Sequence, residues 1–243
     1  MQPELKPVRT DNQAFGRTTY DAAQDVAVTA QSQKVLRNTY MLLALTMIPT
    51  VIGAAVGVST DFSFPRGYPV MGPLLMLAVM IGLLFSVSRF RNSSIGVLLL
   101  LVFTFIAGWW LGPMLQVALG FRNGPQLIGM AAGGTGVVFF TMATIATVSK
   151  KDFGFLGNFL FVGLILLIVA SLANLFFQVP AASLAISAVG VLVFSLFLLY
   201  DVSRIVRGGE TNYIMATMAL YLDIYNLFIS LLNILMALTG QRD

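Results

Sequence analysis

The chain has 243 residues, of which 58% are hydrophobic and only 10% are charged, with a formal net charge of +4. This composition excludes an ordinary soluble domain, because too few charged side chains are available to cover a globular surface. The absence of cysteine and histidine excludes disulfides, thiol and Ser-His catalysis, haem ligation and the usual zinc sites. We expect no cofactor and no nucleic-acid partner, since the basic residues of a membrane protein report its topology.

Residues 1 to about 35 are polar, mixed in charge and without periodicity, so we predict a mobile polar tail there and no signal peptide. Continuous apolar runs follow, and about 20 such residues of helix cross a hydrocarbon core. Their length argues against β-strands, and the short links between them make neighbouring helices antiparallel. We therefore predict an all-α integral membrane protein, a seven-transmembrane helix bundle over 36–238 with a short tail at 239–243. The seven spans lie near 36–58, 71–88, 94–118, 127–148, 155–177, 182–205 and 213–238.

The lysines and arginines predict the orientation of the bundle. If the N-terminus is cytoplasmic, eleven of the fourteen basic residues fall on the cytoplasmic side, and only Arg66, Arg122 and Arg242 fall outside. Cytoplasmic loops of membrane proteins carry such an excess. We expect a multi-pass membrane protein with a cytoplasmic N-terminus and an outer C-terminus.

Three G-x-x-x-G pairs lie inside the predicted spans. Glycines at this spacing let two helix backbones approach closely, although glycine is common in membrane helices and any one pair can arise by chance. The set favours a compact bundle. The pairs are Gly53/Gly57, Gly108/Gly112 and Gly129/Gly133.

The last span contains an acid deep in the predicted membrane. Counting ~1.5 Å per residue from Tyr213 places Asp223 ~15 Å in, near the midplane. A charge there costs roughly 2.5–3.5 kcal/mol on the insertion scale. Either the group is neutral, or its surroundings offset that cost.

Small and polar residues spaced by three or four share one face of this helix. Leucines and phenylalanines occupy the other faces. Because a lipid-facing helix would not carry a polar stripe, we predict that this last helix is central and turns the stripe inward. The stripe holds Asn212, Ala216, Ala219, Asp223, Asn226, Ser230, Asn233 and Ala237.

A second acid, Asp201, lies near the end of the preceding span. The two spans form a hairpin with a turn near residues 208–209, so Asp201 and Asp223 differ in depth by about one helical turn, ~6 Å. Two carboxylates that meet in a dry bundle cannot both ionise cheaply and would share a proton. Acid would favour the neutral, hydrogen-bonded state, and higher pH would favour repulsion, opening or capture of a cation. Calcium, which takes carboxylate and carbonyl oxygens, is a plausible guest.

Three arginines are candidate counter-ions for this pair. Arg204 follows Asp201 by three residues and could form a purely local pair with it. Arg89 and Arg91 anchor the topology and could also reach the cytoplasmic end of the hairpin. A purely structural, hydrogen-bonded role for Asp223 also remains open.

Several segments resemble the Bax inhibitor (transmembrane Bax-inhibitor-motif) family. The C-terminal signature comprises "LYD" (199–201), "YI" (213–214) and "LYLDIYNLFISLL" (220–232). Within the family the chain resembles the bacterial YccA branch, and the likeness covers about residues 33–238. The segments similar to that branch are "KVLRNTY" (34–40), "GGTGVVFF" (133–140), "KKDFGFLG" (150–157) and "RGGETNYI" (207–214).

The resemblance implies a multi-pass protein of the bacterial inner membrane with seven helices, a central last helix and one of two activities. Family members that carry both aspartates are described as pH-sensitive calcium leaks, and the corresponding pair here is Asp201 and Asp223. An arginine on the second span accompanies the pair in those members. Arg89 and Arg91 are the nearest candidates for it in this chain. The YccA branch implies a non-enzymatic modulator of FtsH, the membrane-anchored protease that extracts and degrades faulty membrane proteins, engaged through the N-terminal tail. We favour the hypothesis that the protein is an FtsH modulator. A pH-gated calcium or cation leak is the alternative hypothesis.

A third, remote reading is an intramembrane aspartyl protease, because those enzymes also carry "YD" on one span and an acid on the next. Here the second acid lies in "YLD", where Leu222 replaces the glycine that gives a substrate room. No "PAL" segment follows it.

Overall fold

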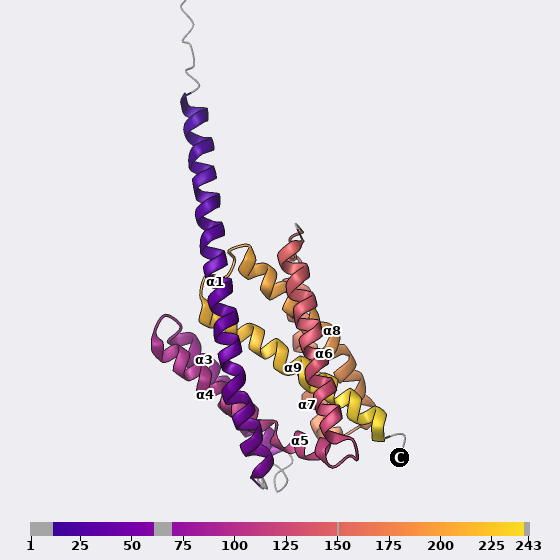
Figure 1. Ribbon diagram of the computed structural model, residues 1–243. Coiled ribbons are helices and arrows are strands. Elements are labelled where there is room, and N and C mark those ends of the chain that lie inside the picture. The colour runs from indigo at the N-terminus through magenta and orange to yellow at the C-terminus, as the bar shows by residue number, and fades with distance from the viewer. Residues whose placement is uncertain (1–11, 61–69, 150, 241–243) are drawn as a thin grey trace, which may run out of the picture.

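The computed structural model describes residues 12–60, 70–149 and 151–240, with only the helix backbone for 12–28. These residues are helical apart from short connections, and no strand occurs among them (Figure 1). The helices are α1 (Asn12–Ser59), α3 (Met71–Arg89), α4 (Ser94–Trp110), α5 (Gly112–Leu119), α6 (Gly124–Val148), α7 (Leu156–Phe177), α8 (Pro180–Val206) and α9 (Tyr213–Gly240).

Seven segments of the described chain are long and apolar enough to cross a membrane, which confirms the number of spans predicted from the sequence. The third, Ser94–Leu119, is built from two helices, α4 and α5. The break falls at Leu111, because Pro113 in the first turn of α5 has no N–H to continue the ladder of α4.

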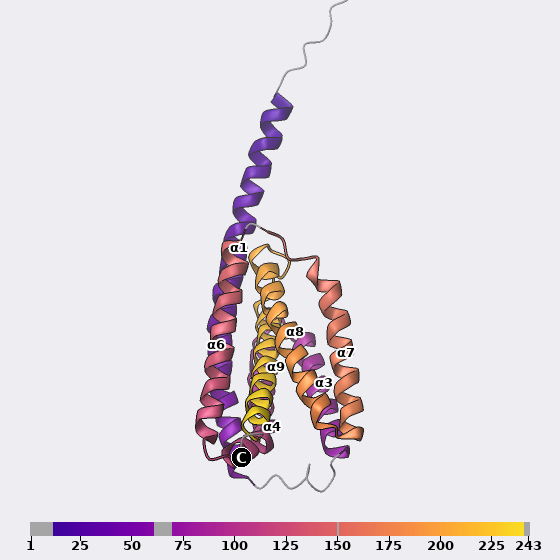
Figure 2. The ribbon, with the colours of Figure 1, turned by 90° about the vertical axis from the view of Figure 1, so that its right-hand side faces the viewer.

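The first helix begins earlier than the sequence predicted. α1 is continuous from Asn12 and projects beyond the bundle, whereas we placed the start of the first span near residue 36, after a mobile polar tail (Figures 1 and 2). Extending an existing helix needs no new nucleus, so a polar segment without its own periodicity continues the helix of the apolar run behind it. Ser32 and Val35 are already buried in the bundle, whose first span starts at Thr29. The mobility of the tail stays a prediction, and residues 1–11 lie outside the described part.

The last helix lies in the middle of the bundle. α9 packs against α8, α6, α1, α4 and α3, and the views in Figures 1 and 2 show it between them. Over residues 213–239 only Leu238 is exposed. The polar stripe predicted this central position, because a helix without a wholly apolar face is best placed among other helices.

Two of the three glycine pairs make the close helix contact that their spacing predicted. Gly53/Gly57 on α1 packs against Gly108/Gly112 at the junction of α4 and α5. A Cβ on Gly53 would lie 2.1 Å from the Phe105 carbonyl oxygen, and one on Gly108 would lie 2.1 Å from the Thr50 oxygen. α1 and α4 therefore touch backbone to backbone. The prediction is wrong for the third pair within this chain: around Gly129 and Gly133 no other atom lies within 4 Å of the Cβ position.

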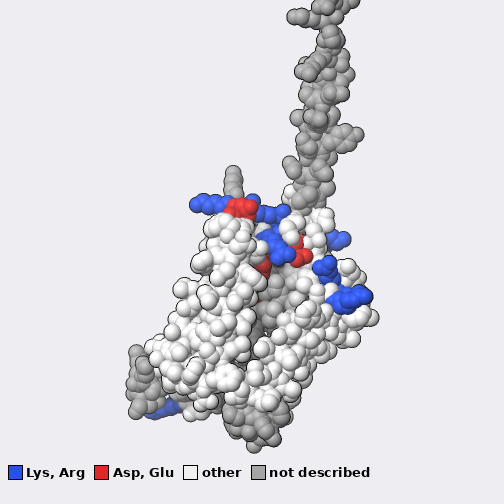
Figure 3. All heavy atoms as spheres, turned by 180° about the vertical axis from the view of Figure 1, so that it is seen from behind, with Lys and Arg blue, Asp and Glu red and all other residues white. Residues whose placement is uncertain are grey.

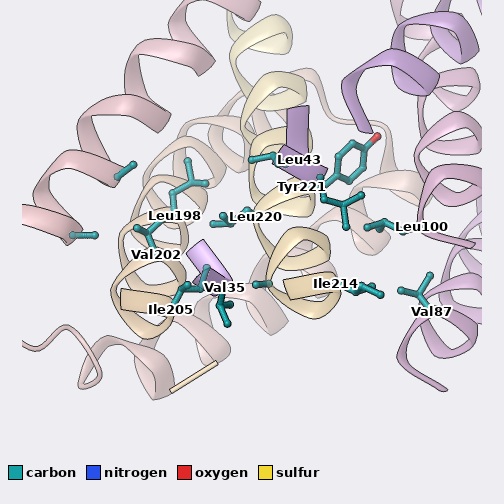
Figure 4. Close-up of a cluster of buried hydrophobic side chains, with 14 of the residues drawn as sticks. Val35, Leu43, Val87, Leu100, Leu198, Val202, Ile205, Ile214, Leu220 and Tyr221 are labelled. Carbon is teal, nitrogen blue, oxygen red and sulfur yellow. The ribbon is translucent and has the colours of Figure 1, made fainter. Parts of the chain in front are cut away.

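The main apolar core joins α1, α3, α4, α6, α8 and α9 near the end from which α1 projects, here called the stem end. Figure 4 shows part of this core around α9. Its labelled members are Val35, Leu43, Val87, Leu100, Leu198, Val202, Ile205, Ile214, Leu220 and Tyr221. Charged side chains gather at the stem end (Figure 3), where the α3–α4, α6–α7 and α8–α9 connections lie.

Candidate functional site

The α8–α9 hairpin is fixed by its turn and by a cap. Gly208 adopts a φ of 76°, which a residue with a side chain rarely does, and the Gly209 amide donates to the Arg204 carbonyl oxygen at 2.8 Å. Asn212 then caps α9: its side-chain oxygen accepts hydrogen bonds from the amides of Ile214 and Met215, both at 3.0 Å. This turn sets the register of the acids on the two helices.

Asp201 lies on α8 and Asp223 lies on α9, the two helices of this hairpin. Each carboxyl group acts electrostatically on the other across the hairpin. Asp223 is only 6% exposed, and its Oδ2 atom has no hydrogen-bond partner in the described structure. A contact between two carboxyl groups requires a proton between them, since two negative charges in a dry interior repel strongly.

The candidate counter-ions differ in their relation to this pair. Arg204 acts electrostatically on Asp201, but its guanidinium donates to Glu210 at 2.8 Å, and no ion pair joins it to Asp201 among the residues described. Arg89 and Arg91 are exposed, at the end of α3 and just beyond it, and the Arg91 carbonyl oxygen accepts a hydrogen bond of 2.9 Å from the Asn212 amide at the start of α9. Arg204 is the arginine that acts on Asp201, and the counter-ion roles of Arg89 and Arg91 stay predictions.

The predicted polar stripe meets a large cleft rather than a closed core. Asn226, Ser230 and Asn233 line a cleft of about 980 Å³ between α3, α7, α8 and α9. Asn226 donates to the carbonyl oxygen of Leu222 in its own helix, and Ser230 is 7% exposed. Leu222 also lines the cleft, on a flank that the sequence pattern assigned to the apolar faces.

Sequence reasoning missed the hydrogen bonds that tie α9 to α1 and α4. The hydroxyls of Tyr221 and Thr50 share a hydrogen bond of 2.9 Å, and the Tyr225 hydroxyl donates to the Ala107 carbonyl oxygen at 2.9 Å. Thr217 donates to the Thr39 carbonyl oxygen at 3.3 Å. The spacing of four residues between the tyrosines, which puts both on one face of α9, was the available signal.

Within the described ranges, His, Cys, Asp and Glu side chains do not come together in a group of three or more. A calcium ion at the acid pair would need carbonyl oxygens or water for its remaining ligands, because it takes six to eight oxygens.

Comparisons with known proteins agree with this architecture. The family model described as "Inhibitor of apoptosis-promoting Bax1" matches residues 32–240. A Vibrio cholerae protein described as "Uncharacterized membrane protein" is 47% identical over 207 residues, covering 85% of this chain and 91% of its own length. The Escherichia coli protein "Modulator of FtsH protease YccA" is 42% identical over 204 residues, covering 84% and 90%. A second Escherichia coli strain has the same match, described as "Inner membrane protein YccA". The chain is therefore a multi-pass inner-membrane protein that belongs to the Bax inhibitor family.

Proposed function

We propose that this protein is a non-enzymatic modulator of an FtsH-type membrane protease, acting in membrane-protein quality control. The observation that carries the proposal is the similarity over most of both chains to the protein named Modulator of FtsH protease YccA. In this proposal the N-terminus is cytoplasmic, as the basic residues predict, and residues 1–35 are the part that the protease contacts. The projecting part of α1 supports this role, because it stands clear of the bundle (Figure 2).

The Asp201–Asp223 pair is the pH-responsive element of this modulator. With one shared proton, the pair holds α8 against α9. At higher pH the second carboxyl ionises and the like charges drive the two helices apart. α9 is hydrogen-bonded to α1 through Tyr221 and Thr50, so a shift of α9 reaches the helix that carries the N-terminal segment.

The test uses purified FtsH and the full-length chain in liposomes, with a model membrane substrate. We expect the chain to alter the degradation rate in a pH-dependent manner. Deleting residues 1–28 should abolish its association with the protease. Asp201→Asn/Asp223→Asn should keep the association but remove the pH dependence. Asp152→Asn, at an exposed carboxylate in the α6–α7 connection, is the matched control and should behave as wild type. Unchanged association after the deletion would contradict the proposal.

A calcium or cation leak is the second candidate function, and the Asp223 Oδ2 atom without a partner favours it. Two adjacent carboxylates, once deprotonated, attract a cation. Calcium release from liposomes should be scanned across pH for wild type, Asp223→Asn and the double variant. A pH-dependent release that the substitutions abolish would support the leak, and no release from wild type at any pH would exclude it.

A further inference from the structure

The cleft between α3 and α7 lies in the half of the bundle away from the stem end. Its walls come from α3 and α7, and its floor comes from α8 and α9. α7 packs against α8, and α3 packs against α4 with a smaller contact to α9. Because the wall helices do not pack extensively on each other, the cleft opens sideways, where lipid surrounds a membrane protein. Figure 3 shows the hollow between two columns of white spheres.

The floor of the cleft is polar. Ser187 on α8 and Ser230 on α9 are 5% and 7% exposed, and both line the cleft. Neither hydroxyl, nor the amide of Asn233, has a hydrogen-bond partner among the described residues. An unsatisfied polar group in hydrocarbon costs free energy, so acyl chains are a poor occupant of this floor.

The walls of the cleft are mainly apolar, and their polar side chains on α7 are Ser171 and Asn174. Leu77 and Ile81 on α3 and Ile168 on α7 line it and are 43%, 43% and 47% exposed. If water were the only occupant of the cleft, these apolar side chains would be exposed to water inside the membrane, which the hydrophobic effect disfavours. The occupant must therefore be apolar on its flanks and carry hydrogen-bonding groups on the side that meets α8 and α9.

A transmembrane helix with a stripe of serine, threonine, asparagine or glutamine has this chemistry. The cleft-lining part of α9 runs from Leu222 to Asn233, eleven residue steps or ~16 Å, which is about three turns of a docked helix. α9 already uses this chemistry inside the bundle, where the hydroxyls of Tyr221 and Thr50 bond across helices.

We propose that the α3–α7 cleft is a docking site for one transmembrane helix of another membrane protein, with the polar stripe of that helix facing Ser187, Ser230 and Asn233. The site does not depend on the N-terminal segment or on the acid pair. It goes beyond the proposed modulator function, because it gives the bundle its own means of holding a membrane-embedded partner.

The test uses the full-length chain in phosphatidylcholine–phosphatidylglycerol vesicles without protease. The native chain has no cysteine, so one introduced cysteine carries one fluorophore. Ile168→Cys reports from the cleft wall, and Leu192→Cys, 66% exposed on α8 and outside the cleft, is the matched control. The probe is a synthetic leucine–alanine transmembrane peptide with one serine–asparagine stripe, compared with the same peptide lacking the stripe.

We expect energy transfer from the striped peptide to the Ile168→Cys label at an at least tenfold lower peptide-to-lipid ratio than from the plain peptide. The Leu192→Cys label should not distinguish the peptides. Ser230→Ala/Asn233→Leu should remove the preference. Equal transfer from both peptides to the cleft label overturns the proposal, as does a preference that survives the floor substitutions.

A thiol-accessibility measurement keeps the proposal falsifiable if the floor variant fails to fold. Asn233→Cys should react with a membrane-impermeant thiosulfonate at least tenfold more slowly once the striped peptide is bound. Arg122→Cys, exposed in the α5–α6 loop, should react at an unchanged rate. If Asn233→Cys reacts as fast as Arg122→Cys with or without peptide, the cleft is a water-filled vestibule and the docking site is refuted.

Discussion

The backbone contact between α1 and α4 predicts that the glycines of this chain respond to alanine in opposite directions. In Gly108→Ala the new Cβ would lie 2.1 Å from the Thr50 carbonyl oxygen and 2.8 Å from its carbonyl carbon. Ordinary contact begins near 3.4 Å, so the backbones must separate by 3.4 minus 2.1, or 1.3 Å, at this point. Overpacking costs about 1–3 kcal/mol, with backbone clashes at the upper end. Against this cost, alanine stabilises a helix by about 1 kcal/mol relative to glycine.

Gly108→Ala should therefore destabilise the fold by about 2 kcal/mol, an apparent Tm decrease of about 4–8 °C at about 2–4 °C per kcal/mol. Gly133→Ala is the matched control: no other atom lies within 4 Å of its Cβ position, so only the propensity gain remains and Tm should rise by about 2–4 °C. Thermal unfolding in detergent, followed by the fluorescence of Trp109 and Trp110 on α4, measures both. Shifts of the same sign and size in the two variants would refute the reasoning.

Three further predictions concern polar contacts, each measured by thermal unfolding in the same detergent. Tyr221→Phe removes the hydroxyl bonded to Thr50, and should cost about 1 kcal/mol; no loss of stability would show that the bond contributes nothing. Asn212→Ala removes the cap of α9, together with the hydrogen bonds that the Asn212 amide donates to Arg91 and Asn92, and should cost at least about 0.5–2 kcal/mol; an unchanged Tm would contradict the capping role. Arg204→Gln breaks the partly exposed pair with Glu210 and should change stability by less than about 1 kcal/mol, so a larger loss would mean that Arg204 supports the acid pair.

Much of the fold was predictable because it depends on local sequence. Uninterrupted apolar runs define the seven spans, and a three-to-four spacing places the acid of α9 on one face with its asparagines. The packing of α8 against α9 followed from the short link between them, which makes neighbouring helices antiparallel. The pairing of Asp201 with Asp223 stays a prediction.

The remaining features depend on interactions between distant segments. The cleft exists because α3 and α7 stand apart, and no periodicity in either helix records that distance. The open Gly129/Gly133 pair has the same sequence pattern as the two pairs in contact, so only the tertiary arrangement separates them. The early start of α1 was missed because its polar residues carry no period of their own.

The length of α1 changes what its far end can do. At ~1.5 Å per residue its 48 residues form a rod ~72 Å long, more than twice the ~30 Å thickness of a hydrocarbon core. A flexible tether would let a bound protein move without consequence for the bundle. A continuous helix is stiffer than a tether and couples movement of the projecting part to the bundle as far as Pro49, where one helical hydrogen bond is missing and the helix can bend before the glycine contact with α4. Binding of a partner to the projecting end of α1 is therefore mechanically coupled to the helix bundle.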